Sequence, residues 1–195
     1  MSNYNLITSD PPWSYSNSRL NGSAARHYPT MSIKELMALP VADLAADNAV
    51  LLMWGTMPLL KESVALVPAW GFEGRHCIPW IKVASSYQGP LEDAPPAYGT
   101  GFWVRGCAEY FIVATRGEVE LPENPGALVA HRTRHSAKPE AMQNWAEASW
   151  PQFTRRLEMF ARRPRTGWHA FGNEGIGSDQ LGQAVDHLSG RNEAA

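Results

Sequence analysis

Residues 4–14 read YNLITSDPPWS, and this stretch fixes where the first element of the fold ends. Its first half is short, apolar and bounded by polar residues, which is typical of a β-strand covered on both faces. Two consecutive prolines then end the strand, because proline fixes φ and has no N–H to donate to a neighbouring strand. Asp10 stands just before the prolines and Trp13 just after them. The sequence therefore predicts a rigid strand end that presents a carboxylate beside a flat ring.

The composition of the chain is that of an ordinary globular protein. Its 195 residues are 44% hydrophobic and 18% charged, with a formal net charge of -2. We expect a single domain, residues 1–195, with no general electrostatic attraction to nucleic acid. The two cysteines do not suggest a metal cluster or a disulfide scaffold, and we find no signal-peptide pattern or membrane-spanning run. We therefore expect a cytoplasmic protein without a metal. Its eight tryptophans fit core packing or base stacking.

Short apolar segments alternate with helical segments along the chain. This order predicts an α/β fold with a mostly parallel sheet flanked by helices. The predicted strands are Asn5–Ser9, Ala49–Trp54, Cys77–Lys82, Tyr110–Thr115, Leu157–Ala161 and Trp168–Phe171. The predicted helices run from the capping box Ser32–Glu35 to Leu39, from Leu59 to Leu66, from a Ser136 cap through Pro139 to Ala148, and between Ser178 and Gly190.

Three polar segments rich in glycine or proline interrupt the alternation, at 14–29, 85–100 and 117–134. Connections of this length in a compact domain are usually disordered or functional. Ligands of open α/β sheets bind beyond the carboxyl ends of the strands, and DPPW stands at such an end. We therefore expect the site at Asp10, with the three segments as substrate loops around it.

The DPPW stretch carries groups suited to binding a planar amine. Taken alone, Asp-Pro-Pro is more often a turn than a site. With Trp13 beside it, the stretch offers the carboxylate of Asp10, the backbone carbonyl of Pro11 and a stacking surface, stiffened by Pro12. Two acceptors, one on each N–H, could aim the exocyclic amine of adenine at an electrophile without a covalent intermediate. We predict Asp10, Pro11, Pro12 and Trp13 as the catalytic residues.

The motif set as a whole resembles the N6-adenine methyltransferases related to the catalytic subunit of the eukaryotic mRNA adenine methyltransferase. That family has many small bacterial and phage members. The likeness includes YPTMS at 28–32, LMW at 52–54, WGF at 70–72, WIK at 80–82, GFW at 101–103 with Glu109, HSAKPE at 135–140, LEMFAR at 157–162 and FGNE at 171–174. The resemblance implies a Rossmann-like fold and a methyltransferase activity that depends on S-adenosylmethionine. It also implies a permuted order, in which DPPW precedes the donor-binding strands.

The resemblance also implies a set of residues that bind the methyl donor. Lys138, in the first turn of the expected helix after Ser136, would bind the donor's carboxylate together with the helix dipole, and a solvated lysine is the alternative. Asp10 would contact the donor's ammonium as well as the target amine. The ribose and adenine contacts are expected from Glu158, Phe160, Arg162, Asn173 and Glu174, with a helix-capping turn as the alternative for Glu174.

Nucleic acid is the substrate that the resemblance implies. The expected substrate-binding residues are Trp13, Tyr15, Tyr28, Arg132, Arg134 and His135. Basic residues between Arg132 and Arg165 fit a phosphate track and plain surface charge equally well. The bacterial and phage members favour DNA, and the eukaryotic ones make RNA the alternative. A non-catalytic nucleic-acid-binding partner is a further alternative, and a homodimer or partner subunit is one source of recognition surface.

Overall fold

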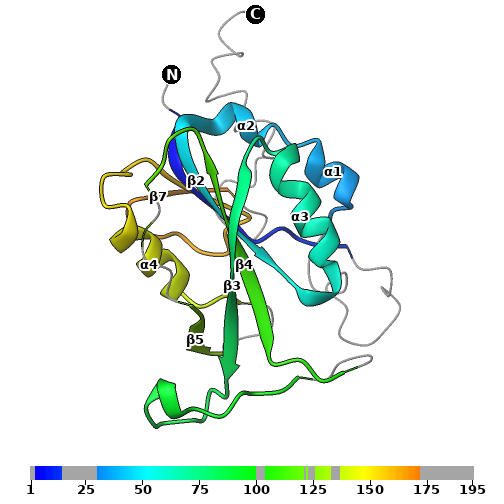
Figure 1. Ribbon diagram of the computed structural model, residues 1–195, viewed down its shortest axis with the longest axis vertical. Coiled ribbons are helices and arrows are strands. Elements are labelled where there is room, and N and C mark those ends of the chain that lie inside the picture. The colour runs from blue at the N-terminus through cyan, green and yellow to red at the C-terminus, as the bar shows by residue number, and fades with distance from the viewer. Residues whose placement is uncertain are drawn as a thin grey trace, which may run out of the picture.

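The computed structural model describes residues 3–14, 30–99, 104–120, 122, 126–132 and 137–171. Within these residues the chain forms a seven-stranded sheet in the order β5-β3-β4-β2-β1-β6-β7 (Figure 1). The strands are β1 (Tyr4–Ser9), β2 (Ala45–Gly55), β3 (Glu73–Val83), β4 (Ala108–Arg116), β5 (Leu128–His131), β6 (Arg156–Met159) and β7 (Trp168–Phe171). The helices are α1 (Ile33–Met37), α2 (Val41–Leu44), α3 (Leu60–Ala69) and α4 (Ala141–Ser149), with short 3-10 turns at Met57–Leu59 and Leu91–Asp93.

Most neighbouring strands run parallel, as the alternation of the sequence predicts. β1 lies between β2 and β6 and is parallel to both, β7 is parallel to β6, and β5 is parallel to β3. β4 is the exception, because it runs antiparallel to both β2 and β3. The sheet is therefore mixed, and the carboxyl ends of β1, β2, β3 and β6 all lie at one edge.

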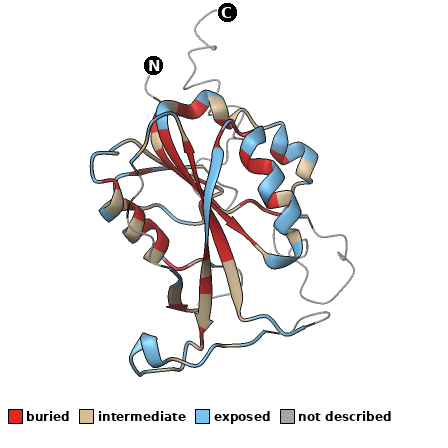
Figure 2. Cartoon of the chain, viewed as in Figure 1, coloured by how far each residue is buried: buried red, intermediate tan, exposed pale blue. Residues whose placement is uncertain are grey.

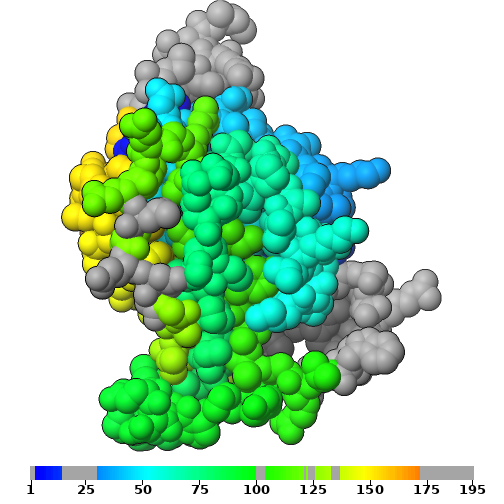
Figure 3. Space-filling view, in the orientation of Figure 1, coloured from blue at the N-terminus to red at the C-terminus, as the bar shows by residue number. Residues whose placement is uncertain are grey.

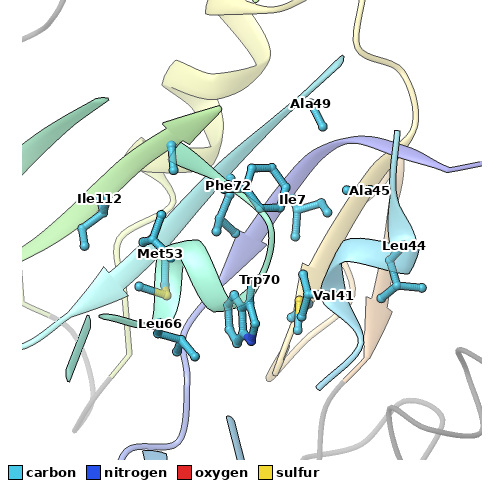
Figure 4. Packing of buried hydrophobic residues seen from close by; sticks show 14 of the residues in the cluster. Ile7, Val41, Leu44, Ala45, Ala49, Met53, Leu66, Trp70, Phe72 and Ile112 are labelled. Carbon is cyan, nitrogen blue, oxygen red and sulfur yellow. The ribbon is translucent and has the colours of Figure 1, made fainter. Parts of the chain in front are cut away.

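The two faces of the sheet are covered by different helices. Along β1, Leu6 points into one buried cluster and Ile7 into the other, as the two-residue period of a strand requires. The cluster around Ile7 includes residues of α1, α2 and α3, and Figure 4 shows Trp70 and Leu66 packed there. The cluster around Leu6 includes Met142 of α4. Figure 1 shows α4 and the α1–α3 group on opposite sides of the sheet.

Burial is concentrated in the central strands of the sheet, which are mostly red in Figure 2. The exposed first half of β3 and the exposed segment 84–99 contrast with them. Segment 84–99 follows the carboxyl end of β3 and projects at the lower end of the space-filling view (Figure 3). This end of β3 belongs to the same edge as the end of β1, so the segment continues outward from the edge at which DPPW stands.

The predicted helix after Ser32 is confirmed. The Ser32 hydroxyl accepts a hydrogen bond from the Glu35 backbone at 3.3 Å, and the Glu35 carboxylate accepts one from the Ser32 backbone at 2.7 Å. This reciprocal capping box starts α1. The helix presses Leu36 into the core, where its carbonyl accepts a hydrogen bond from Trp70 Nε1 at 2.8 Å.

Several predicted boundaries are wrong. The six predicted strands all form, but β2 and β3 begin earlier than expected, and β5 lies inside the segment 117–134 that we expected to be a loop. α2 was not predicted, and α4 begins at Ala141 behind a Glu140 N-cap rather than directly after Ser136. β6 ends at Met159 instead of Ala161, because Phe160 adopts a left-handed φ of 61° that no strand continues. The predicted Ser136 cap and the helix between 178 and 190 lie outside the described residues.

Candidate active site

A large pocket opens at the edge where the parallel strands end. The register places Ser9 of β1 beside Met53 of β2 and Met159 of β6, so the residues that follow these strands converge. The cavity has a volume of about 1110 Å³. It is lined by Thr8, Ser9, Asp10, Trp54, Ala137, Lys138, Pro139, Glu140, Met142, Gln143, Glu158, Phe160, Arg162, Arg163, Pro164 and Arg165.

The two prolines turn the chain sharply at the rim of this pocket. The backbone N–H of Trp13 donates to the Pro11 carbonyl at 2.8 Å, and the Pro12 carbonyl accepts from the backbone of Met31 at 2.8 Å. Ser14 donates to the Met31 carbonyl in return, at 3.1 Å. A carbonyl oxygen has two lone pairs, so the Pro11 carbonyl keeps one acceptor position after this turn is formed. The turn holds Asp10 at the end of β1.

Trp13 is a core residue and not an open stacking surface. Its side chain is only 6% exposed and packs in the cluster of α1–α3, and it does not line the pocket. Stacking of a base on this ring, which the sequence predicts, remains a prediction. In this structure the ring packs in the core and anchors the DPPW turn there.

Lys138 joins two carboxylates at the floor of the site. Its Nζ lies 3.0 Å from an oxygen of Asp10 and 3.2 Å from an oxygen of Glu109 on β4. The ring of Trp54 lies beneath it, with Nζ 5.9 Å from the ring centroid. We expected Lys138 in the first turn of a helix, but α4 begins only at Ala141. Ion pairs rather than a helix dipole therefore position this ammonium.

The site shifts the pKa values of its two carboxylates in opposite directions. Burial is the largest influence on Asp10 and raises its pKa above the ordinary value, although Lys138 opposes this shift. Burial acts on Glu109 in the same direction, but Lys138 and Lys82 outweigh it and hold the pKa of Glu109 below its usual range. Burial disfavours the charge of Lys138, yet Asp10 and Glu109 raise its pKa well above normal. Burial thus dominates at Asp10 and the two lysines dominate at Glu109, and Lys138 remains charged.

The three residues predicted at the end of β6 all line the pocket. Strand alternation explains only Glu158, because Phe160 and Arg162 lie beyond the strand. The left-handed φ of Phe160 turns the chain there, and strained positions of this kind gather at functional sites. Glu158 accepts a hydrogen bond from Gln143 Nε2 at 3.4 Å. Burial raises the pKa of Glu158, against the influence of Arg165 and Arg163.

The wall formed by residues 160–167 is fastened to α4 by an ion-pair cluster. Arg165 donates from Nε and from one terminal nitrogen to the two oxygens of Glu147, at 2.9 and 3.0 Å. Trp168 Nε1 donates to the same carboxylate at 2.6 Å. Arg163 pairs with Glu140 at the start of α4. This cluster fixes the loop against the helix on which Gln143 stands.

Several of the basic residues between Arg132 and Arg165 pair with carboxylates of the fold. These residues are Lys138, Arg156, Arg163 and Arg165. Arg132 is exposed, and its backbone N–H donates to Val83 at 2.8 Å. It does not line the pocket. The other predicted residues, Tyr15, Tyr28, Arg134, His135, Asn173 and Glu174, lie outside the described residues.

Several residues at the site were not predicted as site residues, among them Trp54, Glu109, Gln143 and Lys82. Trp54 follows from the strand register, because it stands at the end of β2 beside β1. A sequence signal exists for Glu109, since a lone acid opens an otherwise apolar strand. Gln143 lies among small and apolar residues of α4 and is buried.

The pocket wall carries polar atoms that have no partner among the described residues. These buried atoms are Thr8 Oγ1, Ser9 Oγ, Trp54 Nε1 and Gln143 Oε1, and all four residues line the cavity. Buried polar groups are normally hydrogen-bonded, and an orphaned one costs about 1–3 kcal/mol. The wall is therefore suited to a polar ligand and poorly suited to an apolar one. The described residues contain no group of three or more His, Cys, Asp and Glu side chains placed to hold a metal. None of the described helices has the length and apolar content to cross a membrane.

The chain is similar to known methyltransferases. It is 29% identical over 194 residues to the type II methyltransferase M.MunI of Mycoplasma sp, an alignment that covers 88% of this chain and 77% of that protein. It is 28% identical to the N6-methyladenosine RNA methyltransferase MTA1 of Cryphonectria parasitica and 27% identical to the N(6)-adenine-specific methyltransferase METTL4 of Homo sapiens. It spans only 51% and 37% of the lengths of these last two proteins.

The family comparison covers nearly the whole described fold. The MT-A70 family matches residues 4–174, which include the DPPW turn, Lys138 and the end of β6. The match thus spans every described residue that lines the pocket. The chain belongs to the MT-A70 family of methyltransferases.

Proposed function

We propose that this protein transfers a methyl group from S-adenosylmethionine to the exocyclic N6 amine of adenine in DNA, and that residues 1–195 act as a single methyltransferase domain. The observation that carries the proposal is the Asp10–Lys138 pair, 3.0 Å long, in a polar pocket at the carboxyl edge of the sheet. Family membership supplies the reaction class.

The volume of the pocket is sufficient for the donor. Sites for small molecules are typically about 300–1,000 Å³, and the cavity here has about 1110 Å³. We propose that the target base enters the same cavity, because a base within a polymer leaves its stack before such a reaction.

The residues of the pocket fit the donor. Its unpartnered polar atoms and its charged floor suit a zwitterionic nucleoside. We propose that Lys138 binds the donor's carboxylate and Asp10 its ammonium. Glu158 and Arg162 would bind the ribose, and Phe160 would pack on the adenine ring. When bound, S-adenosylmethionine supplies a methyl group activated by a sulfonium. Asn173 and Glu174 remain predicted members of this set.

The chain itself supplies orientation and proton acceptance. The Asp10 carboxylate and the free lone pair of the Pro11 carbonyl can each accept one N–H of the target amine. Such acceptors direct the nitrogen lone pair, which is otherwise delocalised into the adenine ring, toward the methyl carbon. The methylated amine then has one proton too many. Asp10 is suited to accept it, because burial raises its pKa.

DNA is the proposed polymer, and RNA is the second candidate. Among the relatives named above, the type II methyltransferase aligns over 77% of its length, and the RNA methyltransferase MTA1 over 51%. The bacterial and phage members that the motifs resemble also favour DNA. A non-catalytic role fits poorly, because Asp10, Pro11, Pro12 and Lys138 are all present and Asp10 is paired with Lys138.

The test is methyl transfer from radiolabelled S-adenosylmethionine to matched DNA and RNA panels, followed by digestion to nucleosides. The proposal predicts label in N6-methyldeoxyadenosine. Label confined to N6-methyladenosine from RNA would replace DNA by RNA in the proposal. Label in neither pool, from protein shown to be folded, would refute the proposed activity.

A further inference from the structure

A row of alternating charges leads from the pocket into the sheet. Asp10 pairs with Lys138 at 3.0 Å, Lys138 with Glu109 at 3.2 Å, and Glu109 with Lys82 at 2.5 Å. Asp10 and Lys138 line the pocket, whereas Glu109 and Lys82 do not. Glu109 and Lys82 do not reach a ligand in the pocket directly. They therefore act on it through Asp10 and Lys138.

The sheet holds Lys82 and Glu109 in a fixed relation. Trp80 on β3 lies opposite Glu109 on β4, and Lys82 is two residues further along the same face of β3. The backbone of Lys82 is fixed on both sides, since its N–H donates to Cys107 at 2.8 Å and its carbonyl accepts from Ala97 at 2.7 Å. The Lys82 ammonium also lies 5.0 Å from the centroid of the Trp80 ring. This ammonium is thus held in place before any ligand arrives.

The four groups form a balanced set, because two ammonium groups neutralise two carboxylates. The side chains of Lys138 and Glu109 are only 12% and 15% exposed. Arg162 and Glu158 also act on Asp10, and they add one charge of each sign. Without Lys82, the remaining three groups carry an excess negative charge where water screens it poorly. Glu109 would then attract Lys138 more strongly, at the expense of Asp10. One of the carboxylates would also take up a proton at a higher pH.

We propose that Lys82 is a positioning residue of the donor site: by neutralising Glu109 it leaves Lys138 in place on Asp10. The inference rests on the proposed function, because it assigns donor binding to the Asp10–Lys138 pair. It adds a residue outside the pocket whose removal alters the pH range in which that pair works. Lys82 does not itself contact the donor.

The experiment measures the affinity for S-adenosylmethionine by calorimetry, from about pH 5.5 to about pH 9. The variants are Lys82→Gln, which keeps a hydrogen-bond donor but loses the charge, and Lys82→Arg, which keeps the charge. Lys61→Gln, an exposed lysine on α3, is the matched control. We expect the acidic fall in affinity of Lys82→Gln to move up by about one pH unit, which is about tenfold weaker binding on that limb. Binding at alkaline pH should stay near wild type, and Lys82→Arg should restore the whole profile.

Each other outcome overturns the inference in a recognisable way. A Lys82→Gln profile that overlays the wild type would remove Lys82 from the site. An equal loss of affinity at every pH, in Lys82→Gln and Lys82→Arg alike, would show a general structural role. Loss of folding in both Lys82→Gln and Lys82→Met, seen by circular dichroism, would assign the residue to stability alone. Absence of donor binding by the wild-type protein would refute the proposed function and the inference with it.

Discussion

Replacing Lys138 by methionine removes the ammonium from between two carboxylates while nearly preserving the volume of the side chain. Lys138 is 12% exposed, and its partners Asp10 and Glu109 are 24% and 15% exposed. Breaking a buried ion pair by removing one partner costs about 3–5 kcal/mol. The residual exposure and the remaining contact of Glu109 with Lys82 reduce this cost. We expect the Lys138→Met variant to lose about 2–3 kcal/mol of unfolding free energy at about pH 8.

The loss of unfolding free energy in Lys138→Met should become smaller as the pH falls. The pKa of Glu109 is depressed in the folded protein, so its stabilisation is present above the unfolded pKa and fades as the pH falls through the folded pKa. In Lys138→Met the pKa values of both carboxylates rise, because their shared cation is gone. Protonation then relieves the repulsion in the variant. The difference in unfolding free energy between wild type and variant should therefore decrease from about pH 8 toward about pH 5.

Urea unfolding, followed by tryptophan fluorescence at both pH values, measures this difference in unfolding free energy. Lys61→Met, on the exposed face of α3, is the control for loss of a lysine. The double variant Asp10→Asn/Lys138→Met should recover part of the lost stability, since it removes one uncompensated charge. A loss of less than about 0.5 kcal/mol, or an equal loss at both pH values, would refute the ion-pair reasoning.

Two further predictions concern the pocket wall and the proposed proton acceptor. Asp10→Ala should abolish methyl transfer and leave the circular dichroism spectrum and cooperative unfolding intact; transfer at near wild-type rate would contradict the role of that carboxylate. Glu147→Gln should lower unfolding free energy by about 1–2 kcal/mol at neutral pH, because Arg165 and Trp168 both donate to this carboxylate. Arg165 is the main influence that lowers the pKa of Glu147, so this effect should fade in acid, and a pH-independent change would count against it.

The sequence predicted the first strand and the order of the elements better than it predicted strand direction and the short strand β5. The apolar strand before DPPW and the alternation of elements follow from short local patterns, whereas the role expected of Lys138 came from the family resemblance. The antiparallel direction of β4 does not, because an apolar strand covered on both faces reads the same in either direction. β5 escaped prediction because it is only Leu128–His131, inside a polar stretch, and pairs with β3 alone.

For the site, as for the fold, short sequence patterns predict some features, and contacts between distant residues determine the others. A tryptophan after a strand fits a stacking surface as well as a core residue, and only the packing against α1 shows that Trp13 is buried. The position of Lys138 was assigned to a helix turn, whereas contacts with β1 and β4 fix it. The Lys82–Glu109 pair depends on the β3–β4 register, which a single sequence does not contain.

The most direct test of the account is calorimetric titration of the wild-type protein with S-adenosylmethionine. The account predicts saturable binding at one site, weakened about 10–100-fold by Lys138→Met, which is the loss expected for one charged hydrogen bond. Lys61→Met should bind as the wild type does. Titration of the folded protein without heat or saturation, or an affinity unchanged by Lys138→Met, would contradict the assignment of this pocket to the methyl donor.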